Sequence, residues 1–149
     1  MSEDLDKEIA ELEAARAQRK ADNEPARKAQ LVKDLKARAR LEELHGELTA
    51  VKLSRFVQGV PTFALVRGPQ SAEYKSFQAR LFAAEKQKGT QGSMNKTIAT
   101  DEFARACWVY PESQDEKTAM LNVASGLLAN IAYAASTLAQ GEEEEEGKG

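Results

Sequence analysis

Apolar residues recur at helical spacing in the first part of the chain. Leu5, Ile9 and Leu12 follow one another at intervals of four and three residues, among Ala, Glu, Lys and Arg residues that favour helices. Such intervals place side chains on one face of a helix. The pattern predicts a helix over residues 2–21 with a narrow apolar seam.

A proline interrupts this helical pattern. Pro25 carries no backbone N–H and disfavours helical geometry at the preceding residue, so the helix is expected to end or kink there. Helix-favouring residues resume at Ala26 and continue to about His45, where Gly46 suits the left-handed conformation that closes helices. Residues 1–46 are therefore predicted to form a charged arm of two helices broken at Pro25.

The pattern then changes from helical to alternating. Val51, Leu53 and Val57 are separated by even numbers of residues, and a turn is expected at residues 58–61. A second β-prone run at residues 62–67 fits antiparallel against the first. The alternation predicts a small β-hairpin, with the alternative that the first run prolongs the preceding helix.

A helix start follows the second strand. The Gly68-Pro69 pair cannot continue a ladder. Ser71 can cap a helix, and Glu73 lies in its first turn, where the helix dipole favours an acidic residue. This helix is expected to reach about Lys86. Its apolar face consists of Tyr74, Phe77, Leu81 and Phe82.

Glycines and polar residues at positions 88–93 predict a flexible loop after that helix. Thr100 can cap a further short helix, which is expected to run through Val109 and to end before Pro111. The sequence therefore predicts a helix, a loop and a second, shorter helix in this part of the chain.

The last ordered part is strongly apolar. Ser113 and Glu116 match a capping box at its start. The apolar stripe beyond them is broken at Ser125-Gly126, so it predicts either one helix or two, closed by Gly141. Residues 142–149 contain five consecutive Glu and predict a disordered acidic tail.

These elements predict a mainly α fold class. The expected order is the helical arm, the antiparallel β-hairpin and then a small helical bundle, with residues 47–141 as one small α-rich domain. The chain begins with an acidic stretch unlike a signal peptide, and no apolar stretch has the length that crosses a bilayer. A cytoplasmic protein without a membrane partner is expected.

Charge is segregated within the arm. Residues 1–13 hold six acids and one base, whereas residues 16–40 hold nine bases and three acids, so their net charges are −5 and +6. Solvated surface helices explain this pattern. Alternatively, the two blocks pair as an antiparallel hairpin, or the basic block docks onto an acidic partner or another subunit. Nucleic acid is not expected, because aromatic residues for stacking are missing from the basic block.

Candidate chemistry is sparse. The single histidine, His45, is expected to interact with the last carbonyls of a helix, and the single cysteine, Cys107, is expected to be a buried apolar side chain. The glycines match no phosphate-binding spacing, and the many carboxylates are expected to be solvated. We therefore expect no enzyme, no metal site and no cofactor.

Protein binding is the remaining class of function. Aromatic residues concentrate in the central part of the chain, and most should form the core, while others are expected to line a groove for a partner's helix or strand. The free edge of the hairpin and the Met120-Leu121 face are candidates for this groove. The candidate partner-binding residues are Phe63, Leu65, Tyr74, Phe77, Leu81, Trp108, Met120 and Leu121.

Residues 51–141 resemble the tail assembly chaperones of long-tailed bacteriophages. The resemblance rests on a strand, a Gly-Pro pair and a helix with the pattern of Pro69, Ser71, Glu73, Tyr74 and Phe77, on the run at residues 107–112, and on the final apolar helix. It implies a small, mainly helical, non-enzymatic protein that binds a tape-measure protein and helps to recruit tail-tube subunits. The N-terminal arm does not match the family's pattern.

Three functions follow as hypotheses. The first is a chaperone-like protein that binds apolar helical segments of a tape-measure client. The second is a structural or adaptor subunit of a virion or another large assembly, which forms a homo-oligomer through its N-terminal helices. The third is a regulatory protein whose basic helix binds nucleic acid.

Overall fold

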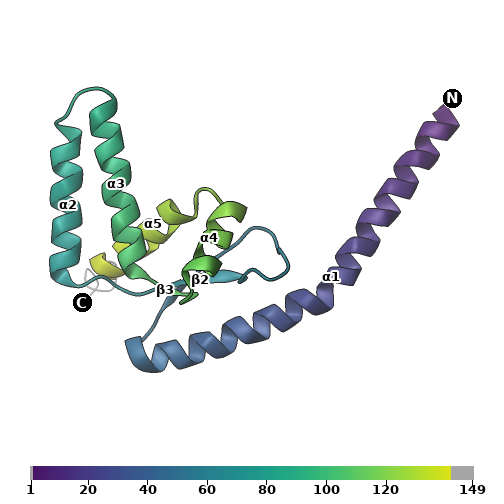
Figure 1. The fold of residues 1–149 in the computed structure, drawn as a ribbon, viewed down its shortest axis with the longest axis horizontal. Coiled ribbons are helices and arrows are strands. Elements are labelled where there is room, and N and C mark those ends of the chain that lie inside the picture. The colour runs from purple at the N-terminus through teal and green to yellow at the C-terminus, as the bar shows by residue number, and fades with distance from the viewer. Residues whose placement is uncertain (1, 142–149) are drawn as a thin grey trace, which may run out of the picture.

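One long helix, a small sheet and four shorter helices make up the fold (Figure 1). The computed structural model describes residues 2–141. The mainly helical fold class is confirmed, and the predicted acidic tail at 142–149 lies outside the described residues. In chain order the elements are α1 (Ser2–His45), β1 (Thr49–Lys52), β2 (Phe63–Val66), α2 (Ser71–Glu85), α3 (Thr90–Cys107), β3 (Trp108–Tyr110), α4 (Gln114–Val123) and α5 (Leu127–Gln140).

The sheet has the order β1-β2-β3, and both pairs are antiparallel. The predicted hairpin is present, with Thr49 opposite Val66, and the first run does not prolong the preceding helix. Its first strand ends at Lys52, however, so Leu53 and Val57 of the predicted alternation lie in the loop between the strands. The prediction of a helix through Val109 is wrong, because α3 ends at Cys107 and the next three residues form β3. Strand β2 offers an edge to which this extended segment can pair, with Leu65 opposite Tyr110.

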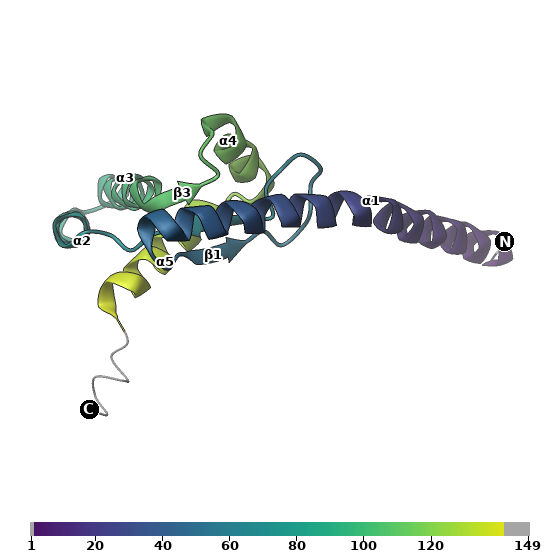
Figure 2. The same cartoon turned by 90° about the horizontal axis from the view of Figure 1, so that it is seen from below.

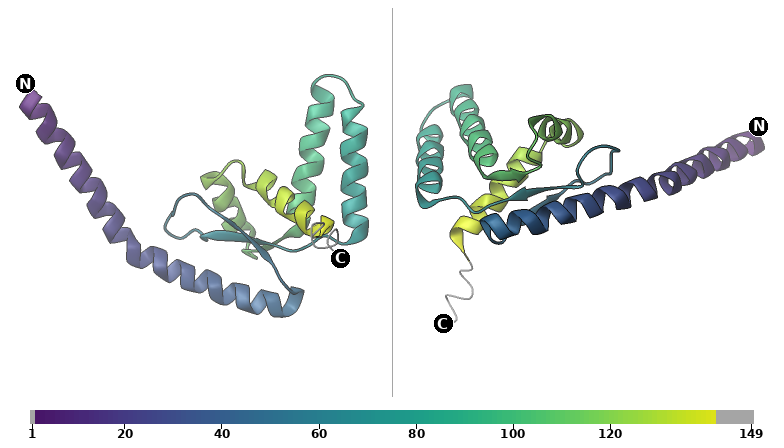
Figure 3. Two further views of the ribbon diagram at one scale, coloured as in Figure 1. Left: turned by 180° about the vertical axis from the view of Figure 1, so that it is seen from behind. Right: turned by 60° about the horizontal axis from the view of Figure 1, so that its bottom comes forward.

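Helix α1 is continuous through Pro25 but changes direction near it (Figures 1 and 3). The expected kink therefore occurs, and the missing proline N–H explains it, but the prediction of two helices broken at Pro25 is wrong. Residues 2–23 are exposed throughout and project away from the body, so the two charge blocks do not fold back on each other. We call residues 2–23 the arm. The predicted arm of 1–46 was too long, because the second half of α1 belongs to the core.

The sheet separates two apolar clusters. Figure 2 shows the second half of α1 running across the sheet. Side chains of a strand alternate between its faces. Phe63 and Leu65 therefore pack towards the second half of α1, beside Leu41, whereas Ala64 and Val66 pack towards the helices that follow the sheet. Both faces of β2 are buried, and this strand is the centre of the domain.

Helices α2 and α3 form an antiparallel pair beside α5. Helix α3 begins at Thr90, so the predicted helix start at Thr100 is wrong, and of the predicted loop at 88–93 only residues 88 and 89 lie outside the helices. A Cβ atom at Gly92 would lie 2.7 Å from the Gln87 carbonyl oxygen and 2.8 Å from that of Ala84. Gly92 therefore lies inside α3 and does not form a flexible turn. Its missing side chain lets the start of α3 approach the end of α2 closely.

The apolar C-terminal part consists of two helices, α4 and α5, which meet at the predicted break before Leu127. Ser113 caps α4 by accepting a hydrogen bond from the Glu116 N–H at 3.4 Å. Among residues 2–141, no single helix is both long and apolar enough to cross a membrane. Helices α4 and α5 meet that criterion only together, and they are bent by 108° relative to each other.

A buried carboxylate fixes α1 to the sheet. Asp34 is 0% exposed, and its Oδ2 atom accepts hydrogen bonds from the Thr62 N–H at 2.8 Å and from the Thr62 hydroxyl at 2.6 Å. Its Oδ1 atom accepts from Gln30 Nε2 at 2.9 Å and from the Tyr110 hydroxyl. Burial and the neighbouring carboxylate raise the pKa of Tyr110, which keeps its hydroxyl protonated as a donor. Asp34 was expected to be solvated with the other carboxylates, and that expectation is wrong.

A second polar contact joins the start of α2 to the end of α3. Arg67 donates two hydrogen bonds to the Glu73 carboxylate, at 2.8 and 2.9 Å, and one to the Ala106 carbonyl at 2.8 Å. Glu73 also accepts from the Gln70 N–H at 2.8 Å. Arg67 first, and then the Gln70 N–H, lower the pKa of Glu73 to about 2.

Replacing Asp34 should destabilise the fold strongly. In Asp34→Ala the Tyr110 hydroxyl and both Thr62 donors lose their buried acceptor, so we expect a loss of about 3 kcal/mol in the free energy of unfolding. Tyr110→Phe removes only one donor and should cost about 1 kcal/mol. Urea unfolding measures both. Asp22→Ala, an exposed change on the same helix, is the control and should stay within about 0.5 kcal/mol. An Asp34→Ala loss no greater than that of the control would contradict this role.

The Arg67–Glu73 contact should make stability depend on acid pH. Because the pKa of Glu73 is about 2 in the folded chain against an ordinary 4.5, the stabilisation is complete above about pH 4.5 and is lost as pH falls towards 2. Glu73→Gln should flatten the unfolding free energy over this interval. Glu85→Gln, which changes an exposed carboxylate at the end of the same helix, should leave the pH profile unchanged. Identical profiles for the Glu73→Gln variant and the natural chain would refute the assignment.

Candidate functional site

Most of the predicted partner-binding residues lie in the core. Phe63, Leu65, Phe77, Trp108 and Met120 are buried. Tyr74, Leu81 and Leu121 are half-buried and pack against the same core. Their roles in partner binding stay predictions, but the five buried side chains expose at most 8% of their surface. Among them, Phe63 also lines a cavity beside the bend of α1. The accessible candidate surfaces lie elsewhere.

The two residues with candidate chemistry have structural surroundings. His45 is exposed at the end of α1, beside Gly46, which has a φ of 80° and closes the helix. Cys107 is fully buried, and burial raises the pKa of its thiol to about 11. No group of three or more His, Cys, Asp or Glu side chains within residues 2–141 is arranged to hold a metal ion.

An apolar groove lies between α5 and the outer strand of the sheet. It has a volume of about 380 Å³. Tyr133 and Leu138, beside the groove, are 76% and 37% exposed. Within residues 2–141, β1 pairs only with β2, so the other edge of β1 is free. The lining residues are Thr49, Ala50, Val51, Asn130, Tyr133, Ala134, Thr137 and Leu138. We call this surface the α5–β1 groove.

The sequence of α5 explains how the groove forms. Ile131 and Ala135 lie one helical turn apart and are buried against the core. Tyr133 and Thr137 are also one turn apart, on another face, and remain exposed. The small side chain of Ala134 between these two faces leaves the groove open. The hairpin edge was predicted as a binding surface, but the contribution of α5 was not.

The arm carries a second apolar surface. Its seam residues Leu5, Ile9 and Leu12 are 61%, 54% and 64% exposed. They lie far from both core clusters, since no residue of the arm is even half-buried. An isolated helix of this length gains little stability without a packing partner. The seam is therefore a surface on which another helix can pack.

A basic cleft lies where α1 bends. Two adjoining cavities, of about 290 and 510 Å³, share Arg27, Ser54, Arg55 and Phe56. Phe56 is half-buried and comes from the loop between β1 and β2. The basic residues lining these cavities are Arg16, Lys20, Arg27, Lys52 and Arg55. We call this surface the kink cleft.

Most positive charge in the kink cleft is unneutralised. Glu24 forms an ion pair with Arg27 at 2.6 Å, and its pKa is lowered chiefly by that hydrogen bond. None of the other four cations has an ion-pair partner among residues 2–141. The sequence revealed the basic block of α1, but it did not reveal that Arg55 and Phe56 lie beside the bend. That arrangement follows only from the docking of α1 on the sheet.

Comparisons with protein-family models, with curated proteins and with solved structures find no significant match to this chain. The candidate surfaces therefore have to be interpreted from their own geometry. Three are accessible: the α5–β1 groove, the apolar seam of the arm and the kink cleft.

Proposed function

We propose that the chain is a non-enzymatic assembly protein that binds apolar helical segments of a protein client. The observation that carries the proposal is the α5–β1 groove. Its lining is apolar or uncharged, which suits recognition of an apolar face rather than acid–base chemistry. In the tail-assembly-chaperone form of this proposal, the client is a tape-measure protein and tail-tube subunits are recruited to the complex.

The groove favours a helical client over an unstructured one. Tyr133 presents a large, rigid side chain above small neighbours such as Ala134, so an apolar side chain of the client can pack beside the ring. A helix places such side chains at intervals of three and four residues along one face. Covering Tyr133 and Leu138 would also remove exposed apolar surface from water, which stabilises the complex.

A structural or adaptor subunit is the second candidate function. The observation that favours it is the arm, whose apolar seam is exposed and packs against neither core cluster. A subunit that assembles through N-terminal helices would cover this seam. The two functions use different surfaces, so one does not exclude the other.

A charged residue in the groove should weaken client binding. Tyr133→Asp places a carboxylate where the client's apolar face would lie, so we expect at least a tenfold loss of affinity, or about 1.4 kcal/mol. The assay is the soluble fraction of an aggregation-prone tape-measure fragment, co-expressed with the natural chain or with the variant.

Phe82→Asp is the matched control, because Phe82 is an aromatic residue 61% exposed on α2 and does not line the groove. It should leave the client as soluble as the natural chain does. Equal client solubility with Tyr133→Asp and the natural chain would exclude the groove. A fragment that stays insoluble with the natural chain would exclude the chaperone function itself.

A further inference from the structure

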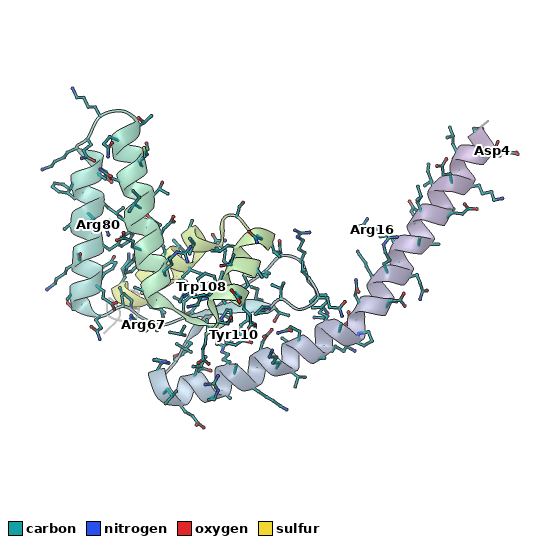
Figure 4. All side chains as sticks on the ribbon, in the orientation of Figure 1. Asp4, Arg16, Arg67, Arg80, Trp108 and Tyr110 are labelled. Atoms are coloured by element: carbon teal, nitrogen blue, oxygen red, sulfur yellow. The ribbon has the colours of Figure 1, made fainter. Side chains whose placement is uncertain are left out.

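The apolar seam and the kink cleft lie on the same face of α1. Successive positions along this face are three or four residues apart, which corresponds to one side of a helix. Figure 4 shows Asp4 near the free end of the arm and Arg16 farther along it, nearer the bend. We call this face the arm stripe; it contains Leu5, Ile9, Leu12, Arg16, Lys20, Asn23 and Arg27.

The two halves of the arm stripe differ in chemistry. The first half is apolar and is flanked by acids, among them Asp6, Glu8 and Glu13, while the only base of residues 2–13, Lys7, lies on the opposite face. The second half is basic, since residues 14–28 hold five bases and two acids. Lys52 and Arg55 add positive charge beside it. In charge, each half of the arm stripe is therefore complementary to the other half, and not to the same half of another copy.

We propose that two copies of the chain pair through antiparallel arms, so that the acidic, apolar end of each arm lies on the kink cleft of the other. The proposal rests on the second candidate function, self-association through the arm, and specifies its partner and arrangement. It does not depend on client binding at the α5–β1 groove.

The length of the arm fits this arrangement. From Ser2 to the bend at about Glu24 the helix is roughly 34 Å long, at 1.5 Å per residue. Two such helices that overlap fully in antiparallel orientation place the start of each beside the bend of the other. In that register Leu5 lies opposite the partner's Asn23, and Leu12 lies opposite the partner's Arg16. The contact is the same from both copies and closes as a two-fold dimer.

The kink cleft can cover the apolar seam as well as neutralise its charge. The aliphatic stems of Arg16 and Lys20 can pack on the partner's seam, while their charged ends reach the flanking carboxylates. Phe56 adds apolar surface at the end of the cleft. A parallel pair would instead place acids beside acids and bases beside bases, which costs free energy.

An exchange of charges between two variants tests the proposal. In one variant Glu8→Lys and Glu13→Lys reverse the acidic half, and in the other Arg16→Glu and Lys20→Glu reverse the basic half. We expect the natural chain to be a dimer that weakens as salt concentration rises. Each variant alone should dimerise at least tenfold more weakly, about 1.4 kcal/mol, because like charges meet. An equimolar mixture should restore a dimer, since both contacts then join opposite charges.

Light scattering coupled to size-exclusion chromatography measures these states in the full-length chain. All four substituted side chains lie on the exposed arm, so circular dichroism should confirm an unchanged fold. Three results would overturn the proposal: a natural chain that stays monomeric, variants that dimerise as strongly as the natural chain, or a mixture that stays monomeric. If the natural chain stays monomeric and a single-stranded oligonucleotide binds at the kink cleft, that cleft would be a nucleic-acid-binding site instead.

Disulfide formation tests the orientation. Leu5→Cys mixed with Asn23→Cys should form an intermolecular disulfide, because the two positions face each other in the antiparallel pair. Leu5→Cys alone should not crosslink, since its copies lie at opposite ends of the dimer. The natural Cys107 is buried and can be retained. Faster crosslinking of Leu5→Cys alone than of the mixture would show a parallel pair, and would overturn the arrangement while leaving self-association in place.

Discussion

The hydrogen bonds that Asp34 accepts determine how the rest of the molecule is arranged. The carboxylate joins α1, the start of β2 and the end of β3, three segments that are far apart in the sequence. A buried charge without a cation is costly unless donors surround it, and four hydrogen bonds meet that requirement here. Because the donors of Thr62 and Tyr110 occupy fixed places at the sheet, they set both the rotation of α1 about its axis and its position along the sheet. Apolar contacts at Leu41 and Phe63 alone would allow several such positions.

This docking divides α1 into two parts with different roles. The second half is held by Asp34, by Arg38, which donates to the Leu48 carbonyl at 3.0 Å, and by the apolar contacts of Leu41. The first half receives its helical nucleus from the docked half and extends beyond the body as the arm. The bend near Pro25 lies between the two parts, and the basic residues around it meet the β1–β2 loop only because the docked half brings them there.

The sequence predicted the elements that local chemistry specifies and missed those that depend on distant contacts. Helical spacing, the Gly68-Pro69 stop and the Ser113 cap each act within a few residues, and the corresponding elements are present. Strand β3 is only three residues long, which is too short to show the alternation of apolar and polar residues that marks a strand. It becomes recognisable only where it pairs with β2. In the sequence Gly92 looked like a loop glycine, because the close contact with α2 that requires a glycine at this position exists only in the folded chain. Asp34 resembled a solvated acid because its donors come from residues 28 and 76 positions away in the chain.

The candidate sites follow the same division. The apolar seam of the arm and the two charge blocks were visible in the sequence, because each belongs to one helix. The α5–β1 groove and the kink cleft combine residues from separate elements, and no local pattern marks them. The arm itself shows why segregated charge suits an extended helix. If acids and bases alternated along it, pairs within the helix would neutralise one another at three- and four-residue spacing and leave no net charge for a partner. With the charges separated, few of them are satisfied within the arm. In the proposed dimer each half of the arm meets the other half from a second copy, because the first half of α1 points away from its own body.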